Sequence, residues 1–474
     1  MNFPTTQFLG FFLTVFAVYW LLPWHRARMV WLLLASCAFY MSWHPWLILL
    51  ILLSASVDYV VALLFDDVKS LTWGRLLLFG SIGFNLSLLA FFKYTNFMLD
   101  SANSMFALLG VEYRSPLFDN LLLPLGISFY TFETISYVVD VYMGRFRAVR
   151  NPIDYALYIM FFPHLAAGPI VRPRDFLPQV ERRKRFDWYR LVVGMQIALV
   201  GLFKKAVIAD HMPPVVDPVF KCPELYSSAS IWLATLAYTV QIYCDFSGYS
   251  DMAMGMAHML GFKLPVNFHM PYFAASITEF WRRWHISLSS WLRDYLYVPL
   301  GGNRGGKLAT YRNLMITMLL GGLWHGASWT FVFWGAYHGA LLSLHRAFGR
   351  GAQADTAGGV VGVSRHVVCV LATFLSVCIG WVFFRAQTFG DAGTVVTRLV
   401  WPTVGLNLHP GHVLLVGLSV LAVFLGHLAG TFLSWRRLER RLPAPALGGA
   451  LAFLLLLALL LMPEASKGFI YFQF

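Results

Sequence analysis

The sequence predicts an all-α integral membrane protein that crosses the bilayer many times. Of its 474 residues, 58% are hydrophobic and 12% are charged, whereas ordinary soluble domains carry about 25% charged residues. Many apolar runs approach the ~20 residues that a helix needs to span the hydrocarbon core. These runs lack the alternation of a membrane β-barrel, so helices are the structure that satisfies the backbone in lipid.

The charged residues are distributed as in a membrane protein. The net charge of +13 would also suit a nucleic-acid-binding protein. The lysines and arginines, however, collect in short loops beside apolar runs, as the positive-inside rule predicts for a cytoplasmic face. The five cysteines form no CxxC pair and lie mostly in apolar runs, so neither a disulfide scaffold nor a zinc site is indicated.

The first four expected spans occupy residues 8–22, 29–41, 45–65 and 76–92. The first span has no lysine or arginine before it, and the basic sequence HRAR follows it at 25–28. A signal peptide carries its positive charge ahead of its apolar region, so we expect a retained anchor whose N-terminus lies outside. The sequence KYTNF at 93–97 is expected to form a short turn at the membrane interface.

The next span, residues 121–144, is apolar except for Glu133 and Asp140. The two carboxylates are about two helical turns apart and therefore share one face. That face should point into the helix bundle, where a carboxylate finds a partner. A proton relay in a transporter and a buried ion pair that holds the bundle together both remain open.

Residues 161–190 cannot form one continuous span, because they contain four prolines and proline interrupts a helix. We expect a short or re-entrant element that contains His164, followed by a cytoplasmic loop. The basic run at 181–185 in that loop would suit an anionic lipid or a phosphate-bearing substrate. A solvated positive-inside loop is the simpler explanation.

Residues 191–210 and 231–243 are further spans, and the second leads into an unusually polar stretch at 244–262. Three glycines in this stretch permit close helix approach or a local break. Its polar side chains would either line a cavity or bind helices together. The polar residues concerned are Asp245, Ser247, Tyr249 and Asp251, directly after Tyr243.

Three more spans, at 366–384, 412–432 and 446–462, are expected in the last part of the chain. Residues 349–362 have no apolar periodicity and are predicted to form a loop. The basic sequence WRRLERRL separates the last two spans, and the aromatic tail FIYFQF suits a membrane interface. No separate soluble domain or internal repeat is visible, so we predict one membrane domain, 1–474, with about ten to fourteen membrane elements.

Residues 281–339 place two histidines, His285 and His325, among tryptophan, leucine and glycine. Ionisable groups at membrane depth are costly and rarely face lipid, so such a pair indicates a functional site. A lone histidine, by contrast, is more often a core residue that a nearby carbonyl satisfies. His338, in the same stretch, is interpreted in that structural way.

The sequence around the two histidines favours general base chemistry. They are too far apart for one metal-binding helix, Asp294 is the one further ligand nearby, and no GxSxG elbow occurs. A histidine that acts as general base on a hydroxyl remains, with a second polar side chain that positions or stabilises the reacting carbonyl. Trp324 and Trp329 would make the surroundings of His325 apolar and keep its imidazole neutral.

Glycine and basic residues flank both histidines. Three glycines in GGLWHGAS, at 321, 322 and 326, would clear space for a bound group beside His325. Beyond His285, PLGGNRGGK forms a glycine-rich basic turn, which matches no Walker pattern. Phosphates of a nucleotide-bearing donor would suit this region, and the candidate contacts are Arg282, Arg283, Arg293, Arg304 and Lys307.

Long motifs in this chain resemble a known family. They are TEFWRRWHISLSSWLRDYLYVPLGGNRGG, YRNLMITMLLGGLWHGASWTFVFWGAYHG, LLLPLGISFYTFETISYVVDVY, FFPHLAAGPIVR and AYTVQIYCDFSGYSDMAMG, and more loosely the opening MNFPTTQFLGFFLTVFAVYW. The chain resembles the membrane-bound O-acyltransferase family, and within it the alginate O-acetyltransferase subgroup of bacterial inner membranes. The similarity extends over about the first 345 residues and weakens afterwards. A related subgroup moves D-alanine onto teichoic acids, but the motifs are closer to the acetylating subgroup.

The resemblance implies a fold and an activity. The fold would be a ring of transmembrane helices with short re-entrant helices around a central tunnel, with a catalytic core at 120–345 and C-terminal helices at 366–474. The enzyme would transfer acetyl from cytoplasmic acetyl-CoA across the inner membrane, without a metal, for O-acetylation of an exopolysaccharide such as alginate or cellulose. A periplasmic or membrane-anchored acetyltransferase protein would be its partner.

The resemblance also assigns roles to residues. The family's WHG motif makes His325 the catalytic residue, and its second polar position falls on His285. His285 would orient the acceptor or hold the thioester oxygen. The residues expected to line the tunnel are Trp281, Trp284, Trp324, Tyr243, Asp245, Ser247 and Tyr249.

Two other classes of protein were weighed against the acyltransferase. A secondary transporter would explain Glu133, Asp140 and Asp245 within spans, but transporters usually show internal repeats and none is visible. A structural subunit of a polysaccharide export complex would explain the apolar bulk of the chain. It gives no reason for the two histidine motifs.

Overall fold

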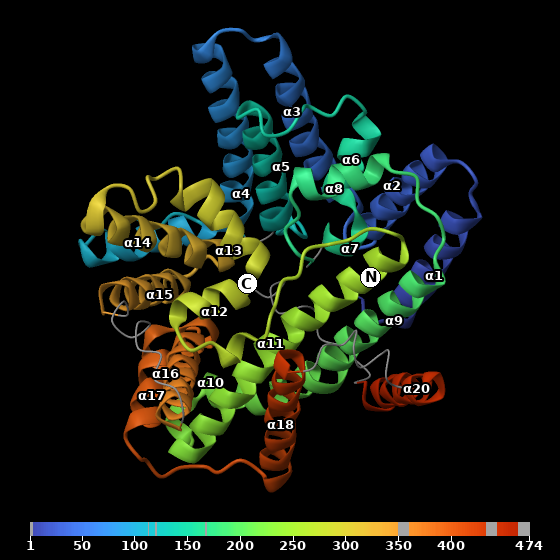
Figure 1. The fold of residues 1–474 in the computed structure, drawn as a ribbon. Helices are drawn as coiled ribbons and strands as arrows, with labels where there is room; N and C mark the ends of the chain where they lie inside the picture. The colour runs from blue at the N-terminus through green and yellow to red at the C-terminus, as the bar shows by residue number, and fades with distance from the viewer. Residues whose placement is uncertain are drawn as a thin grey trace. The chain divides into compact units, whose positions relative to one another are not determined.

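The computed structural model describes residues 3–111, 113–118, 121–165, 168–348, 360–432 and 443–462. In these residues the regular structure is helical, apart from an isolated β-bridge between Tyr226 and Leu406 (Figure 1). The all-α prediction is therefore confirmed. Contacts divide the chain into two compact units, the first formed by Met1–Ala198 with Met252–Pro265 and the second by Leu199–Asp251 with Val266–Phe474.

Among the described residues, several helices are long and apolar enough to cross a membrane. These five are Pro45–Asp67, Leu71–Leu108, Trp188–His211, Val361–Arg385 and Pro410–Phe432. Two shorter apolar helices, Thr6–Leu21 and Pro445–Leu461, accompany them. Each of these seven helices covers a span that the sequence predicts, as expected for a polytopic membrane protein. The expected ring around a tunnel stays a prediction.

The first unit is built mainly from helices of the N-terminal part of the chain. They are α1 (Thr6–Leu21), α2 (His25–Met41), η1 (Pro45–Leu47), α3 (Ile48–Asp67), α4 (Leu71–Leu108), α5 (Ile127–Tyr142), α6 (Pro152–Met160), α7 (Phe162–Leu165), α8 (Pro173–Glu181) and α9 (Trp188–Leu202), of which the last four residues already belong to the second unit. The basic sequence HRAR opens α2 and is held by specific contacts. Its Arg28 is buried and donates to the Leu22 carbonyl at 2.7 Å, and its Arg26 pairs with Asp154 at 2.8 Å.

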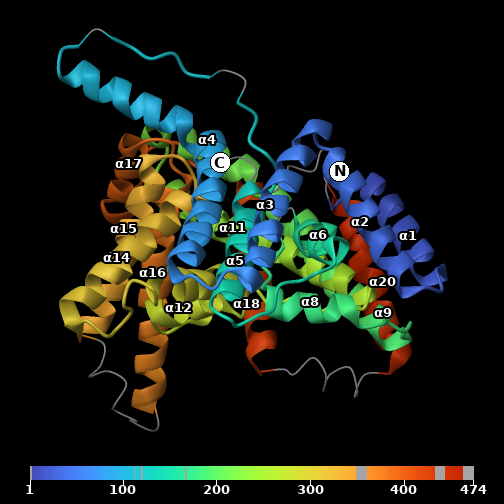
Figure 2. The same cartoon turned by 90° about the horizontal axis from the view of Figure 1, so that it is seen from above.

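Helix α4 runs well past the predicted span, and the expected turn at KYTNF is wrong. No glycine or proline interrupts residues 84–108, so nothing in the local sequence ends the helix. Two asparagines seven positions apart, Asn96 and Asn103, then bind the chain that follows the helix. Asn103 exchanges two hydrogen bonds with the backbone of Ser115, and Asn96 does the same with Phe118. Figure 2 shows this chain after α4.

The two carboxylates of α5 are buried, each with a basic partner. Glu133 Oε2 lies 3.3 Å from His164 Nε2, and its Oε1 accepts the backbone N–H of Val171 at 2.9 Å. Asp140 lies 3.4 Å from the guanidinium of Arg145. The Glu133–His164 contact joins α5 to α7, and the Asp140–Arg145 ion pair is local to the end of α5. Both carboxylates therefore have a partner, and the proton-relay alternative stays untested. His164 lies in the short helix α7, in agreement with the short element predicted there, and α8 follows where a loop was expected.

The second unit contains the remaining helices. They are η2 (Phe203–Ile208), η3 (Ala209–His211), α10 (Pro213–Lys221), η4 (Pro223–Leu225), α11 (Ser228–Met259), η5 (Pro271–Phe273), α12 (Ile277–Arg283), α13 (Ile286–Leu292), η6 (Arg293–Tyr297), α14 (Gly306–His325), α15 (Trp329–Phe348), α16 (Val360–Arg385), α17 (Phe389–Val400), α18 (Pro410–Phe432) and α20 (Ala444–Leu461). Helix α11 is continuous and the glycines in it do not break it, although its last turns belong to the first unit. The local break that the glycines permitted does not occur within the helix.

Helices α14 and α15 pack more extensively than any other pair of described elements, and both views show them side by side (Figures 1 and 2). Glycines make this approach possible. A Cβ on Gly335 would collide with the Met318 carbonyl, and one on Gly322 would collide with the Phe331 carbonyl. Such close backbone contact between membrane helices depends on small residues.

Three predicted segments lie wholly or mostly outside the described residues. They are the loop at 349–362, of which α16 includes the last three residues, the basic sequence WRRLERRL and the tail FIYFQF. The single-domain prediction for 1–474 and the core at 120–345 also stay predictions.

Candidate functional site

His285 occupies a strained position between two short helices. Its backbone φ is +43°, in the left-handed region, where it precedes α13. This conformation costs a non-glycine residue about 1–2 kcal/mol, and strain of this kind clusters at functional sites. The side chain is fully buried. The strain and the burial both hold the imidazole in one place.

A buried asparagine, Asn267, holds His285 from the segment after α11. The Asn267 side-chain oxygen lies 3.1 Å from His285 Nδ1, and it also accepts hydrogen bonds from the N–H and hydroxyl of Ser287. The Asn267 amide nitrogen donates to the hydroxyl of Ser250 at 3.2 Å. His285 Nε2 is buried and has no hydrogen-bond partner among the described residues.

His325 is the last residue of α14 and lies in an aromatic enclosure. Its ring centroid is 5.0 Å from those of Trp324 and Trp334, and 5.3 Å from that of Phe384. Trp324 therefore contributes to the apolar surroundings, as predicted. Trp329 is instead 55% exposed. The apolar surroundings of His325 that the sequence assigned to it are formed by Trp334 of α15 and Phe384 of α16.

The fold brings the two histidines together. Their ring centroids are 6.5 Å apart, and the Trp324 ring lies 6.0 Å from that of His285. Both rings belong to the second unit and come from different elements. The pairing inferred from the sequence motifs is thus present in the geometry, although the catalytic roles of these residues remain predictions.

The glycines beside His325 serve helix packing. A Cβ on Gly326 would collide with the ring of Phe331, and one on Gly321 would come 3.3 Å from a methyl group of Leu292. Together with Gly322, these positions are filled by neighbouring protein atoms. The expectation that they clear space for a bound group is therefore wrong.

The polar stretch of α11 divides between two helix faces. Tyr243 and Phe246 lie on the face toward the site, where Phe246 packs 4.5 Å from the His285 ring and Tyr243 lies 6.3 Å from Trp284. Asp245 and Tyr249 instead contact Lys205 of the π-helix η2, whose ammonium also lies 2.7 Å from Asp210.

Asp245 is therefore engaged in a buried ion cluster on the face of α11 that carries Lys205. Ser247 is also buried on α11. No structural fact tests the predicted tunnel-lining role of these residues. Trp284, predicted to line the tunnel, is buried among aromatic rings, with Trp381 at 4.9 Å and Phe268 at 5.0 Å.

A cavity of about 870 Å³ lies entirely within the second unit, and neither His285 nor His325 is among the residues that line it. Trp281 and Ile286 line it, on either side of His285 in sequence. The ring of Trp281 lies 5.7 Å from that of Trp334, which in turn contacts His325. One wall of the cavity is thus joined to His325 through two tryptophan rings. The cavity also contains the polar side chains of Ser276, Thr278, Glu279, Ser289, Ser290, Asn303, Thr317 and His345.

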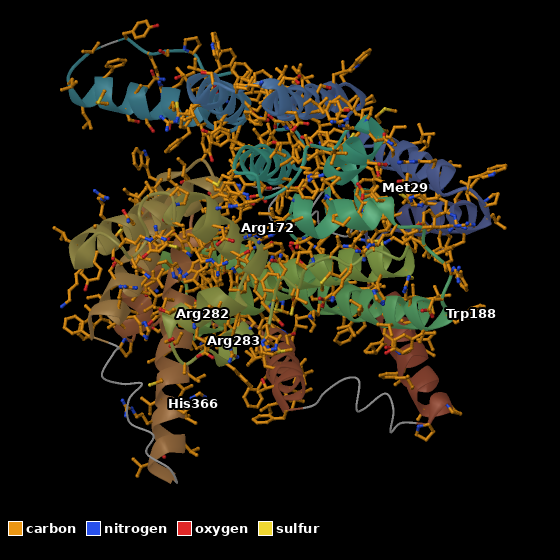
Figure 3. The ribbon with its side chains drawn as sticks, turned by 45° about the horizontal axis from the view of Figure 1, so that its top comes forward. Met29, Arg172, Trp188, Arg282, Arg283 and His366 are labelled. Atoms are coloured by element: carbon orange, nitrogen blue, oxygen red, sulfur yellow. The ribbon has the colours of Figure 1, made fainter. Side chains whose placement is uncertain are left out.

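The predicted phosphate contacts are only partly at this cavity. Arg282 and Arg293 line it, while Arg283, Arg304 and Lys307 do not. Figure 3 shows Arg282 and Arg283 together on α12. Arg283 is paired with Glu279 at 2.5 Å and donates to the Met270 carbonyl. These two contacts account for the position of the Arg283 side chain.

The arginines that line the cavity differ in their ion-pair partners. Arg293 is paired with its neighbour Asp294 at 2.7 Å. Arg346, from the end of α15, lines the cavity and has no ion pair among the described residues, as is also true of Arg282. The sequence-based list missed Arg346 because it lies 39 residues after Lys307, the last residue of the basic turn, although its place at a helix end was a visible signal.

His338 is a core residue, but neither of its ring nitrogens has a hydrogen-bond partner among the described residues, so the carbonyl expected to satisfy it is not found there. It is fully buried on α15 among the rings of Trp281, Trp334 and Phe280, at 4.8 to 6.3 Å. It does not line the cavity. Among the described residues, no group of three or more metal-ligating side chains is found.

Comparison with known proteins identifies the family. A model of the membrane-bound O-acyltransferase family matches residues 146–358, which include both histidines. A probable alginate O-acetylase of Pseudomonas syringae pv. tomato is 45% identical over 83% of this chain and 74% of its own length. A probable alginate O-acetylase of Pseudomonas putida is 39% identical over 100% of both chains.

A third relative carries a different name. The peptidoglycan O-acetyltransferase of Helicobacter pylori is 38% identical over 85% of this chain and 78% of its own length. The similarity to the Pseudomonas putida protein extends through the C-terminal helices, beyond the family model's match. This multi-pass membrane protein therefore belongs to the membrane-bound O-acyltransferase family and is an O-acyltransferase.

Proposed function

We propose that this protein transfers acetyl groups from cytoplasmic acetyl-CoA across the bacterial inner membrane for O-acetylation of an exopolysaccharide of the alginate type. The observation that carries the proposal is the pair of buried histidines, His285 and His325, in the unit that also holds a cavity lined by Arg282 and Arg346. The names of the relatives support an acetyl group as cargo and a glycan as its destination.

The geometry supports general base catalysis by His325. His325 takes the proton of an acceptor hydroxyl as the oxygen attacks the thioester carbonyl carbon. The new C–O ester bond forms, the C–S bond breaks, and the proton passes from His325 to the departing thiolate. His285 either orients the acceptor or stabilises the carbonyl oxygen. The surrounding rings of Trp324, Trp334 and Phe384 exclude water, which favours transfer over hydrolysis.

The cavity fits a donor that carries phosphates and a long thin arm. A volume of about 870 Å³ is within the range of sites for cofactors. Arg282 and Arg346 supply positive charge that no described carboxylate neutralises, and arginine suits phosphate recognition. Ser289 and Ser290 on α13 add hydroxyls along the same wall.

The acceptor side is proposed from the relatives and the membrane setting. Two relatives are named for alginate and one for peptidoglycan, so a sugar hydroxyl is the common final acceptor. Alginate is preferred because the two alginate relatives are 45% and 39% identical to this chain and the peptidoglycan relative is 38% identical. Cellulose is the second polymer. A polymer outside the membrane requires a periplasmic or membrane-anchored protein that completes the transfer.

A thiol-release assay tests the proposed function. Purified protein in detergent is mixed with acetyl-CoA and an alginate oligosaccharide, with and without a periplasmic acetyltransferase protein from the same organism. We expect free thiol to appear with wild type and to fall to background with His325→Ala, while both proteins elute as folded species. A His325→Ala protein that releases thiol as fast as wild type would contradict the proposal.

The same assay addresses the two rival classes. A transporter or a structural export subunit would release no thiol in any combination. Membership of the O-acyltransferase family already weighs against both. The carboxylates that suggested a transporter, Glu133, Asp140 and Asp245, each have a basic partner in the structure.

A further inference from the structure

We propose that Asn267 is a positioning residue that fixes the tautomer of His285, so that Nε2 of this ring is a hydrogen-bond acceptor for a hydroxyl of the substrate. The proposal rests on the proposed function and narrows it. Two roles were open to His285. The proposal gives it the role of orienting the acceptor and excludes the role in which the neutral ring donates a hydrogen bond to the thioester oxygen.

The identity of the Asn267 atom that faces His285 follows from a third group. The backbone N–H of Ser287 points at the same atom from 3.2 Å. A backbone N–H only donates, so this atom is the amide oxygen. An amide oxygen only accepts, and it lies 3.1 Å from His285 Nδ1. The hydrogen of the neutral imidazole is therefore on Nδ1, and Nε2 carries a lone pair.

Asn267 cannot readily turn to offer its other atom. Its amide nitrogen donates to Ser250 on α11 at 3.2 Å, and its oxygen also accepts from the Ser287 hydroxyl at 2.9 Å. The side chain is fully buried. Turning the amide would leave buried donors unsatisfied, at a cost of about 1–3 kcal/mol for each one.

The Nε2 atom of His285 faces protein that offers it no hydrogen. The rings packed on His285 are those of Phe246, Phe268, Trp324 and His325, and Nε2 has no hydrogen-bond partner among the described residues. A buried polar atom without a partner requires an explanation, and a role in the reaction is one of them; for His285 the neighbouring His325 ring favours this explanation. A lone pair selects a donor, and a sugar hydroxyl beside His325 is the donor that the proposed reaction brings.

With this tautomer the two histidines have different roles. His325 takes the proton of the hydroxyl that reacts, while His285 accepts a hydrogen bond from a hydroxyl of the same acceptor and fixes its orientation. Correct orientation of this kind accounts for large parts of a rate enhancement. Asn267 contacts His285 and takes no part in the reaction itself.

The test compares three substitutions at and around Asn267. Asn267→Leu removes the amide oxygen at similar volume, and we expect kcat to fall roughly 10–100-fold, as for other residues that orient an active-site histidine. Asn267→Asp keeps an acceptor oxygen and is expected to restore most of the activity. Asn313→Leu, at a buried asparagine of α14 that donates to Gly302 at 3.1 Å, is the matched control for loss of a buried amide.

Two readouts distinguish positioning from a general structural role. The KM for acetyl-CoA should stay at its wild-type value in Asn267→Leu, because Asn267 does not line the donor cavity. In a His285→Ala background, Asn267→Leu should cause no further loss of kcat, because its effect passes through His285. Losses that multiply, or an Asn267→Asp variant as slow as Asn267→Leu, would overturn the proposal.

The tautomer itself is measured by nitrogen NMR of protein labelled at histidine. The signals that vanish in His285→Ala belong to this ring, and we expect a protonated Nδ1 and an unprotonated Nε2. A protonated Nε2 would overturn the proposal while leaving acetyl transfer by wild type intact. Absence of acetyl transfer by wild type would instead contradict the proposed function, whatever the tautomer.

Discussion

Cationic side chains near the donor cavity differ in whether a carboxylate already neutralises them. Arg283 is paired with Glu279 and Arg293 with Asp294. Arg282 and Arg346 line the cavity without an ion pair among the described residues. An arginine indicates a phosphate-binding role only when its ion-pair partners are known. The sequence alone does not show which carboxylates those partners are.

Removing either unpaired arginine is expected to weaken donor binding. A hydrogen bond to a charged group contributes about 1.5–3 kcal/mol, so Arg282→Ala and Arg346→Ala should each raise the KM for acetyl-CoA roughly tenfold or more, with little change in kcat. Initial rates over a range of acetyl-CoA concentrations measure both constants. Arg304→Ala is the control, since Arg304 is exposed outside the cavity, and an equal effect there would contradict the assignment.

Residue roles were predictable where a motif carried them and not where tertiary contacts decide them. The two histidines stood out because ionisable groups are rare in such apolar sequence. Asn267 gave no comparable signal, since its importance depends on the fold that places it beside His285. For Asp245 the sequence left two roles open, because a polar residue in a span looks the same whether it lines a cavity or binds another helix. The structure pairs it with Lys205, and its tunnel-lining role stays a prediction.

Among the elements, the packing of α14 on α15 fixes the position of His325. Gly322 and Gly335 bring the two backbones together, and the chain leaves α14 directly after His325. The helices themselves were predictable from apolar length. The end of α4 was not predictable from the sequence. Asn96 and Asn103 contact residues 118 and 115, which lie beyond the helix, and such contacts leave no signal in the local sequence.

A methyl group at the α14–α15 contact should destabilise the protein. In Gly335→Ala the new Cβ would meet the Met318 carbonyl, and overpacking of this kind costs about 1–3 kcal/mol. Thermal unfolding in detergent should therefore begin at a lower temperature. The matched change Gly417→Ala has open space around it and should be neutral or slightly stabilising, because alanine favours the helix. Equal melting temperatures for the two variants would contradict this packing.

At the scale of the whole molecule, the composition was sufficient to predict a polytopic helical membrane protein. The sparse charge and the long apolar runs leave few alternatives, and five helices of spanning length are present among the described residues. Apolar length does not report which short helices are re-entrant, so the expected ten to fourteen elements and the tunnel stay predictions. The single membrane domain likewise remains a prediction beside the two compact units.

The positive-inside rule makes a testable statement about orientation. The basic segment between α8 and α9 and the basic turn before α14 should both lie in the cytoplasm. In a variant without native cysteines, Arg183→Cys and Arg304→Cys should react with a membrane-impermeant maleimide in inverted vesicles and not in intact cells with a permeable outer membrane. Both side chains are exposed. Labelling of Arg304→Cys from outside would place the donor cavity on the wrong face for acetyl-CoA.

The central claim is that His325 performs the chemistry while the equally buried His338 supports the fold. The most direct measurement is transfer of radiolabelled acetyl from acetyl-CoA to the acceptor by His325→Gln and His338→Gln, each purified and shown to be folded. The account predicts a loss of roughly 10²–10⁴-fold for His325→Gln, the range for removal of a general base, and near wild-type rates for His338→Gln. Comparable losses in both variants, or an active His325→Gln, would contradict it.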